Sequence, residues 1–279
     1  MPSVANVTTD DVAVPDSDRL AGVSTVRAGT GTGPALVLAH GAGGSIPANF
    51  GRVIEALGSE RTLLGANYPG TEGSALGAAP LTLDGLADTL IAVADAAGVD
   101  RFPILGMSLG SAVAVTAAHR YPDRVTGLLL TVGLGHADAQ LRSVVSAWRA
   151  LAAVGDTDAL AALILSAGSS PATLAQLDPA AETVARQQIS AGFEPGGPAQ
   201  AELVAGVDIR PLLAGIAVPT VVMAAGQDRL VLPSTTRDLA AGIPGAELIE
   251  YPDAGHIFTD DEERRWIGDI RGFLTAQAL

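Results

Sequence analysis

The stretch FPILGMSLGSAVAVTAAHRYPDRV (residues 102–125) decides how the chain is interpreted. An apolar run ends at the Gly-Met-Ser-Leu-Gly motif of residues 106–110, and an apolar pattern of helical spacing begins at once. A Gly-x-Ser-x-Gly turn between a strand and a helix lifts the serine hydroxyl above the edge of a sheet. We therefore predict that Ser108 is a nucleophile. The alternative role for this serine is an ordinary helix N-cap.

A serine hydroxyl is a weak nucleophile and needs a base that is oriented by an acid. Among the four histidines, His256 lies in a loop directly after a predicted strand, and Asp228 lies in the loop after the preceding strand. The order Ser108, Asp228, His256 is one in which serine triads occur. All three fall at the carboxyl ends of predicted parallel strands, where open α/β sheets place their sites. Asp138, which follows another strand, is a rival for the acid.

An acyl-transfer site also needs two donors for the oxyanion. The N–H of Leu109 is one of them, because it directly follows the serine. The segment HGAGGS (residues 40–45) follows a short apolar run, and Gly41 allows the backbone to turn there. We predict that the N–H of Ala42 is the second donor.

Strands and helices alternate along most of the chain, which predicts an α/β fold with a mostly parallel sheet covered on both faces. Residues 134–210 carry only helical patterns, which predicts a helical cap inserted into a core of residues 1–133 and 211–279. The predicted strands are 23–29, 35–40, 61–67, 101–107, 124–133, 217–226 and 246–252. The predicted helices of the core are 47–57, 81–98, 109–122, 233–243 and 260–277.

The composition argues against several classes of function. The formal net charge of −14 disfavours binding to nucleic acid and to anionic membrane surfaces. The first twenty residues lack the basic and apolar regions of a signal peptide, and no apolar stretch reaches the length of a membrane span. Cysteine is absent, and neither a metal-ligand cluster nor a phosphate-binding loop is recognisable. We expect a cytoplasmic protein with a small-molecule substrate and no cofactor.

Six motifs, in this order within residues 35–260, resemble the serine-nucleophile branch of the α/β-hydrolases: HGAGGS, YPGTEGS, GMSLGS, HRYPDRV, GQDRLVLP and DAGH. The resemblance implies a sheet of the eight-stranded type flanked by helices, with the cap roofing the substrate pocket. One departure is Asn67, which stands where the family often has aspartate. That position usually supports a loop and performs no chemistry.

Together these features predict a serine hydrolase that cleaves a small to medium apolar ester, lactone or thioester through an acyl-enzyme. Ser108 attacks the carbonyl, His256 takes its proton, and Asp228 holds the imidazole, while the amides of Ala42 and Leu109 bind the oxyanion. The alternative is a lyase or elimination enzyme on the same fold, in which His256 abstracts a proton from carbon. A non-catalytic receptor is disfavoured because the predicted triad is complete.

Overall fold

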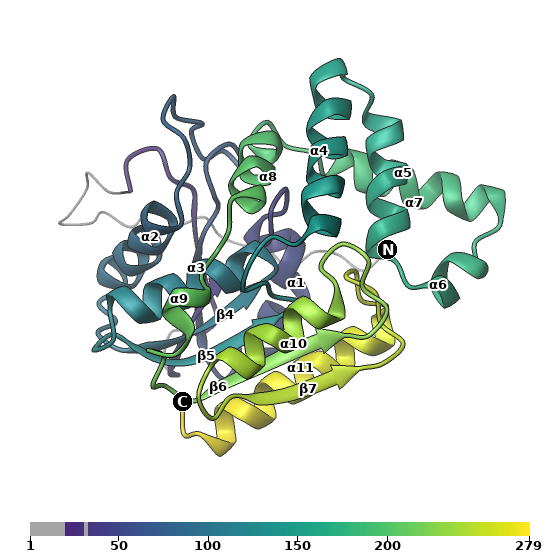
Figure 1. Cartoon of the computed structure of the whole chain (residues 1–279). Coiled ribbons are helices and arrows are strands. Elements are labelled where there is room, and N and C mark those ends of the chain that lie inside the picture. The colour runs from purple at the N-terminus through teal and green to yellow at the C-terminus, as the bar shows by residue number, and fades with distance from the viewer. Residues whose placement is uncertain (1–19, 31–32) are drawn as a thin grey trace.

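The computed structural model describes residues 20–30 and 33–279. These residues form a seven-stranded sheet in the order β1-β3-β2-β4-β5-β6-β7 (Figure 1). Neighbouring strands are parallel except β1, which runs antiparallel to β3. The α/β class is thus confirmed, with one strand fewer in the described residues than the eight-stranded type. The strands are β1 Thr25–Ala28, β2 Ala35–Ala39, β3 Thr62–Ala66, β4 Phe102–Met107, β5 Val125–Thr131, β6 Thr220–Ala225 and β7 Glu247–Tyr251.

Helices cover both faces of the sheet because successive strand side chains point to opposite faces. In β2, Val37 and Ala39 join one apolar core, and Leu36 and Leu38 join the other. The predicted core helices are all present, each within a few residues of its expected ends. The first core is covered by α2 Leu83–Ala96, α3 Leu109–Arg120 and α10 Pro233–Gly242, and the second by α1 Ile46–Leu57 and α11 Asp260–Ala276.

Residues 134–210, called the insert below, lie between β5 and β6 and contain no strand, as expected. The chain leaves and returns at one place, because His136 and Asp208 form an antiparallel bridge and the N–H of Ala137 donates to the carbonyl of Val207 at 2.9 Å. The division into a core and a cap stays a prediction. The helices of the insert are α4 Ala139–Val154, α5 Thr157–Gly168, α6 Pro171–Ala175, α7 Pro179–Ala191 and α8 Gly197–Ala205, and the short α9 Arg210–Leu213 begins at its last residue.

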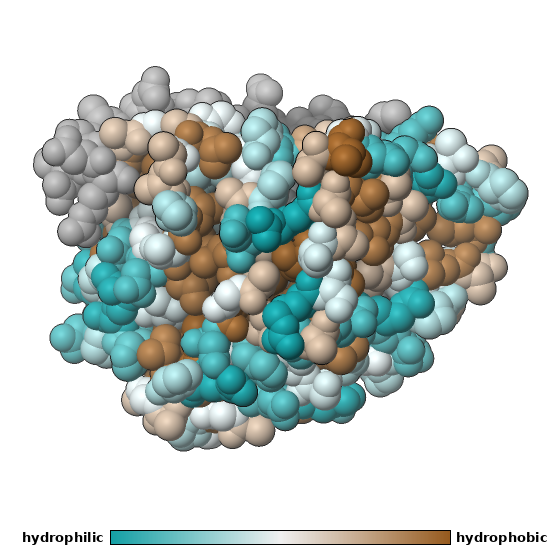
Figure 2. Space-filling model, turned by 45° about the horizontal axis from the view of Figure 1, so that its top comes forward, coloured by the Kyte–Doolittle hydropathy of each residue, from teal (hydrophilic) through white to brown (hydrophobic). Residues whose placement is uncertain are grey.

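The insert stands above the carboxyl ends of the strands, with α4, α5 and α7 projecting beyond the sheet and α8 closer to it (Figure 1). Apolar side chains gather in patches between polar ones across this face of the molecule (Figure 2). Among the described residues, no helix has both the length and the apolar character needed to cross a bilayer.

Candidate active site

Ser108 is the single residue between β4 and α3, and its backbone is strained. Its φ of 53° and ψ of −119° lie outside the regions that L-residues prefer. The N–H of Ser108 donates to the carbonyl of Thr131 on β5 at 2.9 Å, which ties the turn to the neighbouring strand. The side chain makes no capping hydrogen bond to α3. Ser108 thus occupies the N-cap position of α3, but its hydroxyl does not cap the helix.

The two glycines of the motif are required by close backbone approaches. A Cβ on Gly106 would lie 2.5 Å from the carbonyl oxygen of Gly110, and a Cβ on Gly110 would lie 1.8 Å from the carbonyl oxygen of Ala39. Any larger residue would push α3 away from β2 and β4. Because α3 must start this close to the sheet, the turn is sharp and Ser108 stands at its tip.

His256 and Asp228 are brought together by the loops after β7 and β6. The Nδ1 of His256 lies 2.6 Å from the Oδ2 of Asp228, and both side chains are buried. The Oδ1 of Asp228 accepts the N–H groups of Leu230 at 2.8 Å and Val231 at 2.9 Å. A carboxylate can only accept a hydrogen bond, so the proton of this contact lies on Nδ1 of His256. In the neutral ring, Nε2 is then the nitrogen that can accept a proton.

The rival acid, Asp138, is engaged elsewhere. It is the N-cap of α4, where its Oδ1 accepts the N–H of Leu141 at 2.8 Å. Its Oδ2 accepts the hydroxyl of Thr235 at 2.5 Å. Asp138 therefore anchors the first helix of the insert to α10, and Asp228 is the carboxylate bonded to the histidine.

Ser108 and His256 line the same cavity, whose volume is about 590 Å³. Residues 41–44 of the loop after β2 line one part of it, and further lining residues come from α1, α4, α5, α7, α8 and α11 and from the loops after β6 and β7. Apolar side chains of the insert predominate, among them Val145, Trp148 and Ile164. The cavity gives a substrate access to both the hydroxyl and the imidazole.

Among residues 41–44, which line this cavity, one backbone amide has no hydrogen-bond partner. The N–H of Gly41 donates to Asn49 Oδ1 at 2.8 Å, that of Gly43 to Gln200 Oε1 at 2.8 Å, and that of Gly44 to the Gly41 carbonyl at 3.2 Å. Within the described part of the chain, the N–H of Ala42 has no hydrogen-bond partner. The same is true of the N–H of Leu109, at the start of α3. Ala42 is among the residues that line the cavity, whereas Leu109 is not, and their role as oxyanion donors stays a prediction.

Comparison with known proteins assigns the family. Residues 34–263 match the family model of the alpha/beta hydrolase fold. The chain belongs to the α/β hydrolase family. It is 30% identical over 249 residues to a pyrrolizixenacetamide deacetylase of Xenorhabdus hominickii, a match that covers 88% of this chain and 93% of the relative.

A lactonase and an esterase are among the solved structures that share this fold. The enol-lactonase of Burkholderia xenovorans has a TM-score of 0.80 at 23% identity, covering 91% of this chain and 96% of the lactonase. A thermophilic esterase of Thermogutta terrifontis has a TM-score of 0.76 at 24% identity, covering 91% of this chain and 93% of the esterase. At these identities the likeness concerns the fold alone.

In this hydrolase, His40 connects the loop after β2 to the turn after β3 by two hydrogen bonds. It is fully buried, its Nε2 accepts the N–H of Tyr68 at 2.8 Å, and its Nδ1 donates to the carbonyl of Gly41 at 2.8 Å. Burial lowers the pKa of His40 from 6.5 to about 4, so the ring is neutral at pH 7. Asn67 also has a supporting role, because its Oδ1 accepts the N–H of Ile46 at the start of α1.

The His256 loop of the hydrolase rests on the insert. The N–H of Ile257 donates to the carbonyl of Gly168, at the end of α5, at 2.8 Å. A Cβ on Gly255 would lie 2.4 Å from that same carbonyl oxygen, so the loop passes directly against α5. The motif DAGH therefore needs its glycine for a contact with the insert.

Sequence reasoning missed Asn49 and Gln200, the two amide side chains that hold the loop after β2. Gln200 carried one usable signal, since it shares the buried face of α8 with Gly197, Ala201 and Val204. A glutamine in an apolar stripe needs a buried hydrogen-bond partner. No group of three or more His, Cys, Asp or Glu side chains that could hold a metal ion occurs within residues 20–30 and 33–279.

Proposed function

We propose that this α/β hydrolase is a serine hydrolase that cleaves small to medium apolar esters, lactones or thioesters through an acyl-enzyme. The observation that carries the proposal is the joint placement of three groups. Ser108 stands at a strained turn on the wall of a cavity, and His256 lines that same cavity with its Nδ1 bonded to the buried Asp228. This arrangement fits a nucleophile, its base and the acid that orients the base.

The mechanism uses these groups in order. The Oγ of Ser108 attacks the acyl carbonyl while Nε2 of His256 takes its proton, and Asp228 stabilises the imidazolium. The oxyanion accepts the free N–H groups of Ala42 and Leu109. The intermediate then collapses, and the leaving alkoxide or thiolate departs with the proton from His256. A water molecule, activated by His256, attacks the acyl-enzyme and releases the acid.

The cavity supports the choice of substrate class. A volume of about 590 Å³ is in the range of small-molecule sites, and its walls in the insert are largely aliphatic and aromatic. We propose that residues 134–210 act as the cap that selects the acyl group. The relative named as a deacetylase suggests that an N-acetyl amide belongs in the substrate panel beside esters and lactones.

The test combines labelling with a substrate panel. A fluorophosphonate is expected to add one phosphonyl group to Ser108, found by intact mass and peptide mapping. Ser108→Ala is expected to lose labelling and to lower kcat on the best ester by about 10⁴- to 10⁶-fold. Ser146→Ala, which changes an exposed serine of α4, is the matched control and keeps both properties.

Hydrolysis without a labelled Ser108, or near-normal turnover by the alanine variant, would remove Ser108 as the nucleophile. Product analysis separates the elimination alternative, because a lyase leaves a new carbon–carbon double bond and no acyl-enzyme. Medium-chain p-nitrophenyl esters are expected to give a higher kcat/KM than the acetate ester, since each buried CH₂ contributes about 0.8 kcal/mol.

A further inference from the structure

Gln200 is a buried amide of the insert that bridges two loops of the core. Its side chain is fully buried on α8. The Oε1 accepts the N–H of Gly43 at 2.8 Å, and the Nε2 donates to the carbonyl of Pro69 at 3.2 Å. Gln200 therefore spans from the turn after β3 to the loop that carries Ala42.

The turn at Pro69, to which Gln200 is hydrogen-bonded, packs tightly against the start of α8. The N–H of Gly196, directly before α8, donates to the carbonyl of Gly70 at 2.9 Å. A Cβ on Gly196 would lie 2.2 Å from the Pro69 carbonyl oxygen, and a Cβ on Gly70 would lie 2.5 Å from the Cα of Gly196. The two backbones touch, and His40 bonds the preceding residue, Tyr68, to the core. These contacts define the position of α8, and with it the position of the Gln200 side chain.

The other end of the bridge defines the path of the loop around Ala42. The amide of Gly41 is held by Asn49 on α1, and the amide of Gly43 is held by Gln200 on α8. The free N–H of Ala42 lies between these two fixed points. Gly43 has a φ of +71°, and a Cβ there would lie 2.7 Å from the ring of Trp148, so the loop is confined on that side too.

We propose that Gln200 is a positioning residue for the oxyanion hole, which makes the insert part of the catalytic apparatus. Gln200 is not among the residues that line the cavity, so it acts on the reaction through the loop. The inference rests on the proposed serine hydrolase function. Without the bond from Gln200, the Gly43 peptide is released and the Ala42 amide loses its fixed direction.

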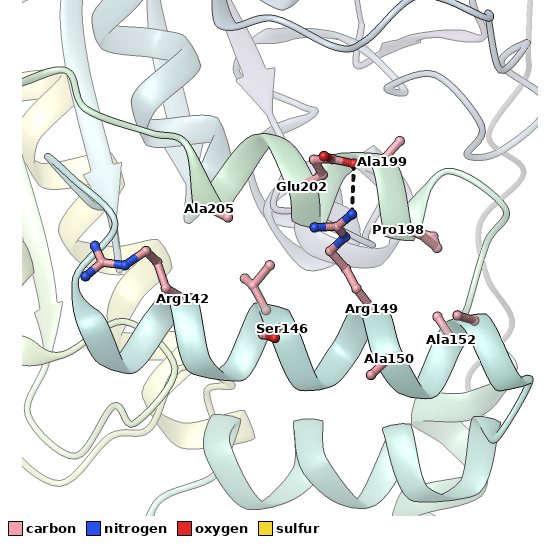
Figure 3. Close-up of a pocket in the computed structure, with 11 residues that line it drawn as sticks. Arg142, Ser146, Arg149, Ala150, Ala152, Pro198, Ala199, Glu202 and Ala205 are labelled. Atoms are coloured by element: carbon pink, nitrogen blue, oxygen red, sulfur yellow. Dashed lines mark ion pairs between the residues drawn. The ribbon is translucent and has the colours of Figure 1, made fainter.

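The side of α8 that faces α4 borders an open groove. The groove has a volume of about 660 Å³ and is lined in part by Arg142, Ser146, Arg149 and Glu202 (Figure 3). Arg149 and Glu202 form an ion pair of 3.3 Å across it, with side chains 48% and 66% exposed. Exposed pairs of this kind contribute little to stability. Besides the apolar packing of Ala201 and Val204, the buried polar contacts that connect α8 to the loops of the core are those of Gln200 and Gly196.

The experiment compares three variants in the hydrolysis of a medium-chain p-nitrophenyl ester. Gln200→Met has a similar shape and loses both hydrogen bonds. Gln200→Glu keeps the acceptor for the Gly43 N–H and loses the donor to Pro69. Gln187→Met makes the same chemical change at an exposed position of α7 outside the cavity and is the matched control. Each protein is also assayed with a trifluoromethyl ketone, to which Ser108 adds to form a hemiketal with its oxygen in the oxyanion hole.

For Gln200→Met we expect kcat to fall about 10- to 100-fold, while KM stays within about twofold of the parent value. The ketone is expected to bind more weakly by the same factor as kcat falls. The expected loss is smaller than the about 10²- to 10³-fold loss of kcat on complete removal of one oxyanion donor, because the Ala42 amide is misdirected and not removed. Gln200→Glu keeps the acceptor but buries a carboxyl group, so it is expected to recover only part of kcat, and Gln187→Met is expected to match the parent protein. If Gln200→Met does not fold, Gln200→Asn, whose side chain is too short to span both loops, replaces it in the same assays.

Unchanged kcat and unchanged ketone affinity would overturn the proposal, and so would a loss confined to KM, which would make Gln200 a determinant of substrate binding alone. The parent protein separates this failure from a failure of the proposed function. If the parent enzyme is not labelled at Ser108 by the fluorophosphonate, the serine hydrolase assignment itself is wrong. If it is labelled while Gln200→Met behaves as the parent, only the role of Gln200 is wrong.

Discussion

Helices α7 and α8 belong to the same insert and line the same cavity, yet they are attached to the molecule in opposite ways. In α8, Gln200 and Ala201 are fully buried, and the helix is hydrogen-bonded to two loops of the core. In α7 no residue is buried, and the ion pairs of Arg186 reach only Asp158 and Glu182 within the insert itself.

The difference suggests two separate roles for the helices of the insert. A helix with buried polar contacts to the core has a defined position, whereas one with few buried contacts opens at a lower free energy. We infer that α8 defines the geometry of the reacting groups and that α7 adapts to the acyl group. Both helices line the cavity, but of the two only α8 is hydrogen-bonded to the loop that carries Ala42.

The largest expected effect is on the free energy of unfolding and concerns His40, which is hydrogen-bonded to Tyr68 beside the turn that contacts α8. Burial lowers the pKa of His40 to about 4, so between this pH and about 6.5 the unfolded chain binds a proton that the folded protein excludes. His40 therefore contributes stability above pH 6.5 that is lost as the pH falls toward 4. The loss amounts to about 3 kcal/mol at 1.36 kcal/mol per pKa unit.

Urea unfolding at pH 7 and near pH 4 measures this effect. The difference in unfolding free energy between the two pH values is expected to shrink in His40→Gln, which has no imidazole to protonate. His119→Gln, at an exposed position of α3, is the control and should keep the pH dependence of the parent. Equal pH dependence in the parent and His40→Gln would show that His40 is not the buried group that titrates.

A matched pair of glycines tests the attachment of α8 against that of α7. Gly196→Ala forces a Cβ to within 2.2 Å of the Pro69 carbonyl oxygen, so α8 must shift. We expect about 1–3 kcal/mol of lost stability and about tenfold lower kcat. Gly192→Ala, after α7, brings its Cβ no closer than 3.5 Å to another atom, and the stability should change by less than about 0.5 kcal/mol.

Thermal unfolding and ester kinetics of the two glycine variants measure these changes in stability and kcat. Equal losses of stability at both positions would mean that α7 is held as tightly as α8, and the contrast between the helices would disappear. A stability loss in Gly196→Ala with unchanged kcat would keep the contrast but detach it from catalysis.

The smallest expected effect lies in α7 itself. Ile189 is a partly exposed residue of this helix whose side chain lines the cavity. Ile189→Ala removes about three methylene equivalents, of which only part contacts the substrate, so we expect a KM about fivefold higher for medium-chain esters. The value of kcat should be unaffected. Steady-state kinetics over a series of acyl chain lengths tests this, and a fall in kcat at constant KM would mean that α7, and not α8 alone, defines the geometry of the reacting groups.

The fold was largely predictable from the sequence because its signals are local. The buried run of β4, the glycines at 106 and 110, and the helical spacing of α3 lie within a few residues of one another. The same holds for the loops that bring Asp228 and His256 into contact, since each follows a recognisable strand. The two ends of the insert were also visible as a break in the alternation of strands and helices.

The role of Gln200 was not predictable in this way. It bonds to Gly43 across 157 residues and to Pro69 across 131, and no local pattern in the sequence marks either pairing. Sequence periodicity likewise could not separate α7 from α8, because the burial of a helix face depends on what packs against it. Three-dimensional contacts between the insert and the core loops supply that information.

The most direct test of the serine mechanism is detection of the acyl-enzyme. The protein is mixed with a medium-chain p-nitrophenyl ester, quenched in acid during the first turnovers, and analysed by intact mass and peptide mapping. We predict that p-nitrophenol is released while the mass of the protein increases by one acyl group, and that this group is located on Ser108. The mass increase is expected to be absent in Ser108→Ala. Ester turnover in which Ser108 stays unmodified, or acylation of a different residue, would contradict this mechanism.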